Sequence, residues 1–145
     1  MVFEMSNIEN KFLCDVKEVN FDIKGDDRGK LAIFEKGFNI PFDIKRVFYI
    51  YGANANISRG HHAHYKTRQL LIAVSGSVII NCEWKENKKS FILNFPDKGL
   101  LIDGMVWHTM DDFSQDCVLM VIADSSYDEA DYIRDYNDFL KETAK

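Results

Sequence analysis

Short runs of apolar or alternating residues, each closed by a turn, fill most of this 145-residue chain and favour an all-β fold. Residues 69–74 and Val78–Trp84 flank Ser75-Gly76-Ser77, a pattern typical of a β-hairpin. Arg46–Tyr51 is rich in the aromatic and β-branched residues that favour strands. Short strands at this spacing predict a sandwich or barrel. Further strands are expected at residues 11–19, 30–35, 90–94, 99–103, 106–110 and 117–123.

The end of the chain has a different period. Between residues 128 and 141, apolar side chains recur at helical spacing, namely Tyr132, Ile133, Tyr136, Phe139 and Leu140. Ser125 or Ser126 can cap a helix there. We therefore expect a C-terminal helix packed on the outside of the barrel. The chain is predicted to form one domain over residues 11–145, preceded by a flexible leader over residues 1–10.

Charge and cysteine usage exclude several classes of protein. The net charge of −5 argues against nucleic-acid and membrane-surface partners. The N-terminus lacks a basic region followed by an apolar run, and no stretch approaches a membrane span, so we expect a cytoplasmic protein. The three cysteines, Cys14, Cys82 and Cys117, are widely spaced without a CxxC pair, which predicts buried free thiols.

The four histidines lie in two short stretches, three of them in Arg59–His64 and the fourth at His108. Alternate residues of a strand point to the same face, so His62 and His64 should project together while His61 faces away. His108 can join the pair from a neighbouring strand. This arrangement predicts either a metal site or an acid–base site.

The residue that separates these two possibilities is Gln69. The general cupin pattern has HxH, then a Glu, then a hairpin glycine, which here is Gly76, and a last His. Three histidines and a carboxylate bind Fe, Mn, Ni or Zn. Here the carboxylate position holds Arg68 or Gln69, a cation or a weaker ligand. The sequence therefore favours acid–base chemistry by neutral imidazoles, with no metal or other cofactor.

Four segments together resemble a known family. They are residues 40–50 (IPFDIKRVFYI), Arg59–His64 (RGHHAH), residues 106–108 (VWH) and residues 127–134 (YDEADYIR). The chain resembles the dTDP-4-keto-6-deoxy-glucose 3,4-ketoisomerases, the WxcM-like family, from about residue 12 to about residue 140. The family usually has an aromatic residue at His61 and a lysine at Tyr65, so this chain departs from it beside the site. The resemblance implies an all-β, cupin (jelly-roll, RmlC-like) barrel with a C-terminal helix.

The resemblance also implies a reaction and an assembly. The family moves a keto group from C4 to C3 of a dTDP-linked 4-keto-6-deoxyhexose through an enediol, in deoxysugar synthesis for surface polysaccharides. We expect His62 to handle the carbon protons and His64 the oxygen protons, although the two roles can be exchanged. Family members are dimers with N-terminal strand exchange, so a homodimer is expected. The final sugar that the resemblance implies is an N-acetylated 3-amino-3,6-dideoxyhexose.

Six further residues are candidates for substrate binding, namely Arg28, Arg46, Tyr49, Arg59, Gln69 and His108. Arg59 can grip the pyrophosphate with a bidentate fork. Strand alternation allows at most one of Arg46 and Tyr49 to point at the sugar. Arg28 lies in a segment that approaches the substrate in the resembling family. It favours the galacto configuration at C4 of the product, which the sequence otherwise leaves open.

Three other functions stay open at this point. One is a metal-dependent cupin dioxygenase, which Gln69 disfavours. Another is a 3,5-epimerase of the same 4-keto sugar, which typically pairs its His with an Asp and uses a Tyr acid. The RGHHAH form fits that enzyme less well. The third is a non-catalytic sugar-binding module.

Overall fold

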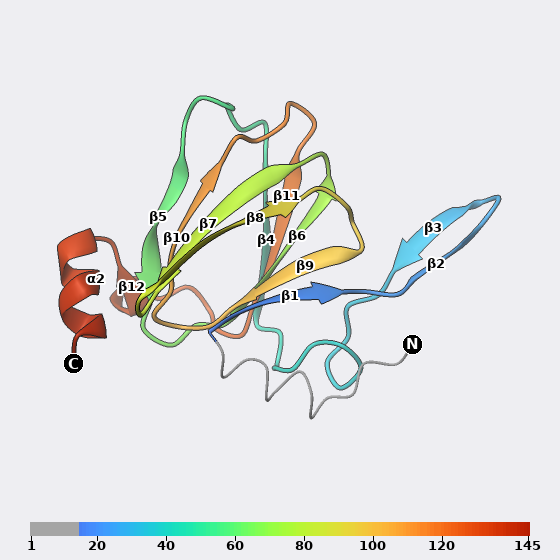
Figure 1. Cartoon of the computed structure of the whole chain (residues 1–145). Helices are drawn as coiled ribbons and strands as arrows, with labels where there is room; N and C mark the ends of the chain where they lie inside the picture. The colour runs from blue at the N-terminus through green and yellow to red at the C-terminus, as the bar shows by residue number, and fades with distance from the viewer. Residues whose placement is uncertain (1–14) are drawn as a thin grey trace.

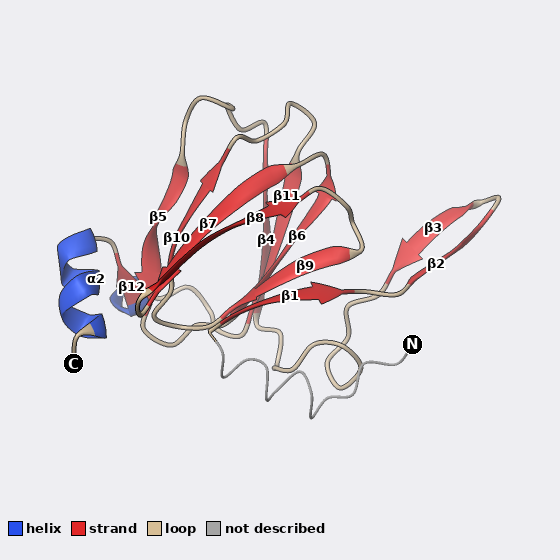
Figure 2. Ribbon diagram, viewed as in Figure 1, coloured by secondary structure: helices blue, strands red, loops and turns tan. Residues whose placement is uncertain are grey.

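The computed structural model describes residues 15–145, so the predicted leader and Cys14 lie outside the described residues. Two five-stranded antiparallel sheets form a barrel-like sandwich (Figures 1 and 2). The first sheet consists, in spatial order, of β1 (Val16–Asn20), β9 (Lys98–Ile102), β6 (Gln69–Ser75), β11 (Val118–Ala123) and β4 (Arg46–Tyr51). The second consists of β12 (Tyr132–Ile133), β5 (Arg59–His64), β10 (Trp107–Asp111), β7 (Val78–Trp84) and β8 (Asn87–Leu93). The prediction of an all-β fold is confirmed.

The main core fills the space between the two sheets. Alternate residues of β7 are buried there, with Val78 and Ile80 packed among inward residues of β6, β9 and β11. A second cluster covers the outer face of the first sheet, where Ile40 and Phe42 pack against Ile72. Strand β6 is therefore buried on both faces, which explains its continuous apolar run.

The predicted hairpin between β6 and β7 turns at Gly76. This glycine has a φ of +66°, and a Cβ there would lie 2.8 Å from Cys117 Cα. Only glycine fits both constraints. Cys82 and Cys117 are buried free thiols, as expected.

The C-terminal helix is shorter than predicted. A 3-10 turn η1 (Glu129–Asp131) and strand β12 come first, and the helix α2 spans only Tyr136–Thr143. Its N-cap is Asp135, not Ser125 or Ser126. Tyr132 and Ile133 form a short strand at the edge of β5, where they pair with His64 and Ala63. This tertiary pairing outweighs the local preference for a helix that the periodicity indicates. The helix itself packs outside the barrel through Phe139, as expected.

Strand β2 (Ile23–Asp26), which the sequence reasoning missed, forms a hairpin with β3 (Gly29–Ala32). This hairpin extends away from both main sheets (Figure 1). Nearly all of its residues are exposed. Within residues 15–145, no helix has the length and apolar character needed to cross a membrane.

Candidate active site

Three of the four histidines gather on the inner face of the second sheet. His62 and His64 project from β5, and His108 on β10 lies directly opposite His62. The ring centroids of His62 and His64 are 5.1 Å apart, and those of His62 and His108 are 4.7 Å apart. The clustering expected from strand alternation is therefore present in the structure.

His61 is exposed and faces away from this cluster, and β5 contains a bulge at this residue. The register with β10 passes from His108↔His62 to Thr109↔Gly60, so His61 is an extra residue in β5. Gly60 has a φ of +89°, and a Cβ there would lie 2.9 Å from the carbonyl oxygen of His108. Glycine therefore permits the close approach of the two strands.

Each inward histidine has its Nδ1 atom against an acceptor. His62 Nδ1 lies 3.1 Å from the Gly60 carbonyl oxygen, and His108 Nδ1 lies 3.2 Å from that of Val106. His64 Nδ1 lies 3.1 Å from a carboxylate oxygen of Asp131. Carbonyl and carboxylate oxygens only accept, so Nδ1 carries the proton in each neutral ring and Nε2 carries the lone pair. Among the described residues, the buried Nε2 atoms of His64 and His108 have no hydrogen-bond partner.

The surroundings keep these imidazoles neutral. Burial, with repulsion from His62, lowers the pKa of His64 to about 4, although Asp131 opposes the shift. Burial and the same neighbour lower the pKa of His108 to about 3. Burial also lowers the pKa of His62. At neutral pH the site therefore offers unprotonated nitrogens, which can accept protons.

Asp131 is a site residue that the sequence reasoning missed. Its carboxylate accepts hydrogen bonds from His64 Nδ1, from the backbone N–H of Lys66 at 3.0 Å and from the Thr67 hydroxyl. Asp131 is 67 residues from His64 in sequence, so no local pattern links the two. The helical pattern instead places it near the start of the predicted C-terminal helix.

Tyr132 was missed for the same reason. Its ring centroid lies 4.4 Å from that of His64 and 5.0 Å from that of His62, so it forms a wall of the histidine cluster. The Arg134 guanidinium lies 4.3 Å from the centre of the Tyr132 ring and is held by two hydrogen bonds to Glu129. The short strand β12 thus brings an aromatic ring to the site, and the residue directly after the strand, Arg134, places a cation against that ring.

Strand β4 places Arg46 and Tyr49 on opposite faces, as alternation requires. Arg46 points inward, where its buried Nε has no hydrogen-bond partner among the described residues. Its guanidinium lies 5.7 Å from the centre of the Tyr127 ring. Tyr49 is 62% exposed on the outer face and does not join the histidines of its own chain. Arg46 is therefore the one of the two that can reach a ligand there.

The other predicted ligands occupy three different places. Gln69 is buried, and its Oε1 has no partner in the described part of the chain. Arg59 is exposed, and its pairing with the buried Met110 directs it to the same face as the histidines. Arg28 lies in the turn of the projecting hairpin, where it pairs with Asp26 and has a 90% exposed side chain. The structure does not bring Arg28 to the histidines of its own chain.

The donor set does not fit the usual cupin metal site. Gln69, a neutral amide, stands where the pattern has a carboxylate. Over residues 15–145, no group of three or more His, Cys, Asp or Glu side chains has an arrangement that could hold a metal ion. The carboxylate of Asp131 contacts His64 at Nδ1, and the Nε2 atom of that ring has no hydrogen-bond partner among the described residues.

Comparison with known proteins assigns this chain to a family. The family model described as "WxcM-like, C-terminal" (FdtA) matches residues 14–144. The chain belongs to the WxcM-like family. A curated relative, the TDP-4-oxo-6-deoxy-alpha-D-glucose-3,4-oxoisomerase of Aneurinibacillus thermoaerophilus, is 44% identical over 129 residues, which cover 89% of this chain and 93% of the relative. The relatives are isomerases, and the predicted membership is confirmed.

Solved structures agree with this assignment. A 3,4-ketoisomerase from Helicobacter canadensis is 44% identical, with a TM-score of 0.88 over 90% of this chain and 98% of that one. A QdtA 3,4-ketoisomerase mutant from Thermoanaerobacterium thermosaccharolyticum, in complex with TDP-4-keto-6-deoxyglucose, is 42% identical, with a TM-score of 0.87 over 89% and 94% of the chains. The RmlC 3,5-epimerase of Legionella pneumophila, at 14% identity and a TM-score of 0.69 over 82% and 71%, shares the fold alone. The predicted RmlC-like cupin fold is thereby confirmed.

Proposed function

We propose that this protein is a sugar-nucleotide 3,4-ketoisomerase that converts dTDP-4-keto-6-deoxy-D-glucose to a dTDP-3-keto-6-deoxyhexose. The observation that carries the proposal is the inward pair His62 and His64, with ring centroids 5.1 Å apart. In each ring, an acceptor at Nδ1 leaves Nε2 free to take a proton. Two such bases meet the requirement of a reaction that moves protons at both carbon and oxygen.

The reaction then follows in balanced proton transfers. A base takes the C3 proton, which the neighbouring C4 ketone acidifies, and the C–H electron pair becomes the double bond of an enediol. The C4 oxygen gains a proton, the C3 hydroxyl loses one as the C3 ketone forms, and C4 receives a proton. One positioned base contributes about 10²–10⁴-fold to such a rate. No step needs an oxidant or a reductant.

The division of work between the two histidines follows from their partners. The sequence assigned the carbon protons to His62 and the oxygen protons to His64. The carboxylate of Asp131 stabilises a protonated His64, whereas His62 has only a carbonyl oxygen at Nδ1. The carbon proton is the harder one to remove. These contacts support the exchanged assignment, with His64 at carbon and His62 at oxygen.

The substrate-binding roles are part of the proposal. Arg46 and Gln69, whose buried polar atoms lack protein partners in the described chain, are suited to bind sugar or phosphate oxygens, and His108 forms the pocket wall. Arg59, at the exposed start of β5, is suited to bind the pyrophosphate. A galacto configuration at C4 and a cytoplasmic location stay predictions, as does the single domain over residues 11–145.

The 3,5-epimerase is the alternative that one observation favours. Such an epimerase typically pairs its His with an Asp, and the structure contains a pair of this kind in His64 and Asp131. The epimerases, however, share only the fold at 14% identity, whereas the two 3,4-ketoisomerases compared above are 42–44% identical over about nine-tenths of the chain. The ketoisomerase is therefore the better supported function.

Incubation with dTDP-4-keto-6-deoxy-glucose in deuterated water containing a chelator tests the proposal. We expect NMR to show a C3 ketone and deuterium at C4, because the base exchanges its proton with solvent before C4 is protonated. Deuterium at C5 would instead indicate the epimerase, and activity lost with the chelator would indicate a metal enzyme. Binding of the sugar nucleotide without any chemical change would indicate a non-catalytic sugar-binding module.

We further propose that the active protein is a homodimer in which the β2–β3 hairpin of one copy reaches the site of the other. The support is the projection of this hairpin away from its own barrel, with Arg28 exposed in its turn (Figure 1). Val47, Tyr49 and Tyr51 form an exposed apolar stripe on the outer face of β4. Such a stripe on a monomer is typical of a protein interface.

Mixing two defective variants tests this arrangement. In a mixed dimer of Arg28→Ala and His64→Asn, exchange of hairpins creates one site with both residues intact. We therefore expect the mixture to be more active than either variant alone. An additive activity in the mixture, or a monomer in sedimentation analysis, would contradict the proposal.

A further inference from the structure

We propose that Asp131, held by Thr67, is a positioning residue that fixes the tautomer of His64 and strengthens it as a base. This inference rests on the proposed ketoisomerase function. Asp131 and His64 are both buried, and the carboxylate meets the Nδ1 atom at 3.1 Å. The unpartnered Nε2 atom of the same ring is the one left for the substrate.

The Asp131 carboxylate is held in its charged form. Burial alone would raise its pKa, but hydrogen bonds from the Thr67 hydroxyl, the Lys66 backbone N–H and His64 outweigh burial and lower the pKa. A charged carboxylate can only accept hydrogen bonds. His64 must therefore donate from Nδ1, so the neutral ring has its lone pair at Nε2.

The same contact acts when His64 takes a proton. The imidazolium then lies against a negative charge in a buried site, where the attraction between the two charges is much stronger than in water. Burial and repulsion from His62 lower the pKa of His64, and Asp131 opposes them, so the pKa would be lower still without Asp131. His64 would then be a weaker base.

The hydrogen bonds also explain why an amide cannot replace the carboxylate. One oxygen of Asp131 accepts from both His64 and Thr67, and the other accepts from the Lys66 N–H. The amide introduced by Asp131→Asn has a single acceptor oxygen. If its NH₂ group faces the Lys66 N–H, two donors oppose each other. If it faces His64 Nδ1 instead, the ring proton moves to Nε2, and that nitrogen can no longer act as a base.

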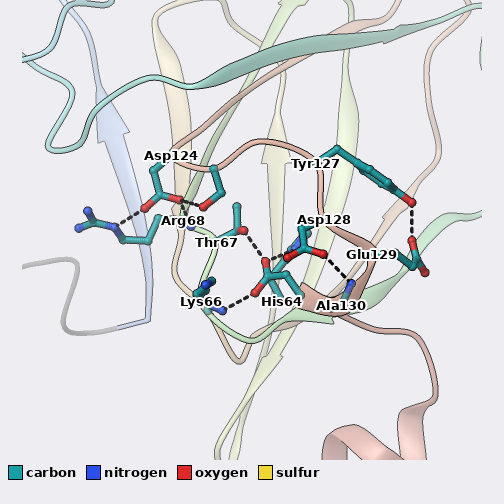
Figure 3. Close-up of polar contacts among 12 residues, drawn as sticks. His64, Lys66, Thr67, Arg68, Asp124, Tyr127, Asp128, Glu129 and Ala130 are labelled. Carbon is teal, nitrogen blue, oxygen red and sulfur yellow. Dashed lines mark hydrogen bonds and ion pairs between the residues drawn. The ribbon is translucent and has the colours of Figure 1, made fainter.

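The kinetic test compares Asp131→Asn with two other variants. We expect kcat to fall about 10²–10⁴-fold in Asp131→Asn with little change in KM, because the buried carboxylate contacts His64 at Nδ1 and the proposal assigns Nε2 to the substrate. Thr67→Val removes one supporting hydrogen bond and should lower kcat roughly three- to tenfold. Asp124→Asn is the matched control, because Asp124 accepts from the Arg68 backbone N–H and side chain away from the histidines (Figure 3). It should keep the wild-type kcat.

Two readouts separate positioning from a structural role. Substrate deuterated at C3 should show a larger isotope effect on kcat in Asp131→Asn, since weakening the base slows carbon deprotonation. Nitrogen-15 NMR of the ring should show the Nδ1–H tautomer of His64 in the wild type and in Thr67→Val. An Nε2–H tautomer in the wild type would overturn the inference, as would a kcat of Asp131→Asn within threefold of the wild type.

The NMR readout also keeps the two proposals distinguishable. A folded wild-type protein that does not turn over the sugar would contradict the proposed function, while its His64 tautomer would still test the Asp131 contact. If Asp131→Asn does not fold, the Thr67→Val variant provides the test. A Thr67→Val protein with the wild-type kcat and an unchanged isotope effect would then overturn the inference.

Discussion

His64→Asn is expected to lower kcat by about 10²–10⁴-fold, because a side-chain amide cannot accept a proton and release it again at neutral pH. The Asn side chain can still donate a hydrogen bond to Asp131 from nearly the same position as Nδ1, so the fold should be retained. Initial rates of sugar conversion, followed by NMR or chromatography, measure the loss. Circular dichroism checks that the variant is folded.

The neighbouring residues supply a matched pair of comparisons. His62→Asn should cause a loss of the same order, since both histidines serve one proton-transfer sequence. His61→Asn should keep the wild-type rate, because His61 is exposed and faces away from the cluster. Asparagine also tolerates the backbone φ of +56° that His61 adopts. Equal losses in all three variants would show that the decrease comes from damage to β5.

Acid should destabilise the folded protein strongly. The pKa of His64 is about 4 and that of His108 about 3 in the folded state, against an ordinary value of 6.5. Since the folded-state pKa values are depressed, the free energy of unfolding is at its full value above about pH 6.5 and falls as the pH decreases. Linkage gives a loss of about 2 kcal/mol for each histidine between about pH 7.5 and about pH 5.

Urea unfolding at the two pH values measures this loss. His108→Gln removes one of the two buried groups, so its stability should fall by about 2 kcal/mol less than that of the wild type over the same range. His61→Asn, which removes an exposed histidine, should retain the wild-type decrease. An unchanged decrease in His108→Gln would show that His108 is not a neutral buried base.

The part of the site that lies on long strands was predictable, and the part from the chain end was not. Period-two alternation sufficed for His62, His64 and His108, because strands β5 and β10 are regular apart from one bulge. The outward position of His61 followed from the same rule. In β4, alternation predicted that at most one of Arg46 and Tyr49 could point at the sugar, and in the structure the two lie on opposite faces, with Arg46 inward.

The segment from η1 to β12 was wrongly predicted as helix for a physical reason. Tyr132, Ile133 and Tyr136 recur at a spacing that suits a helix as well as a two-residue strand followed by a helix. What decides between them is pairing with β5, more than sixty residues earlier in the chain. Pairing between residues far apart in the chain cannot be predicted from a local pattern of residues. Asp131 and Tyr132 could therefore be identified as site residues only from the structure.

The position of β12 near the end of the chain has a consequence for C-terminal truncation. Residues 15–126 contain every strand of both main sheets except β12. The carboxylate partner of His64 lies outside that set, in residues 129–133, which reach β5 by strand pairing. A chain shortened before residue 129 would therefore retain the strands of both sheets except β12 and lose the carboxylate that contacts His64.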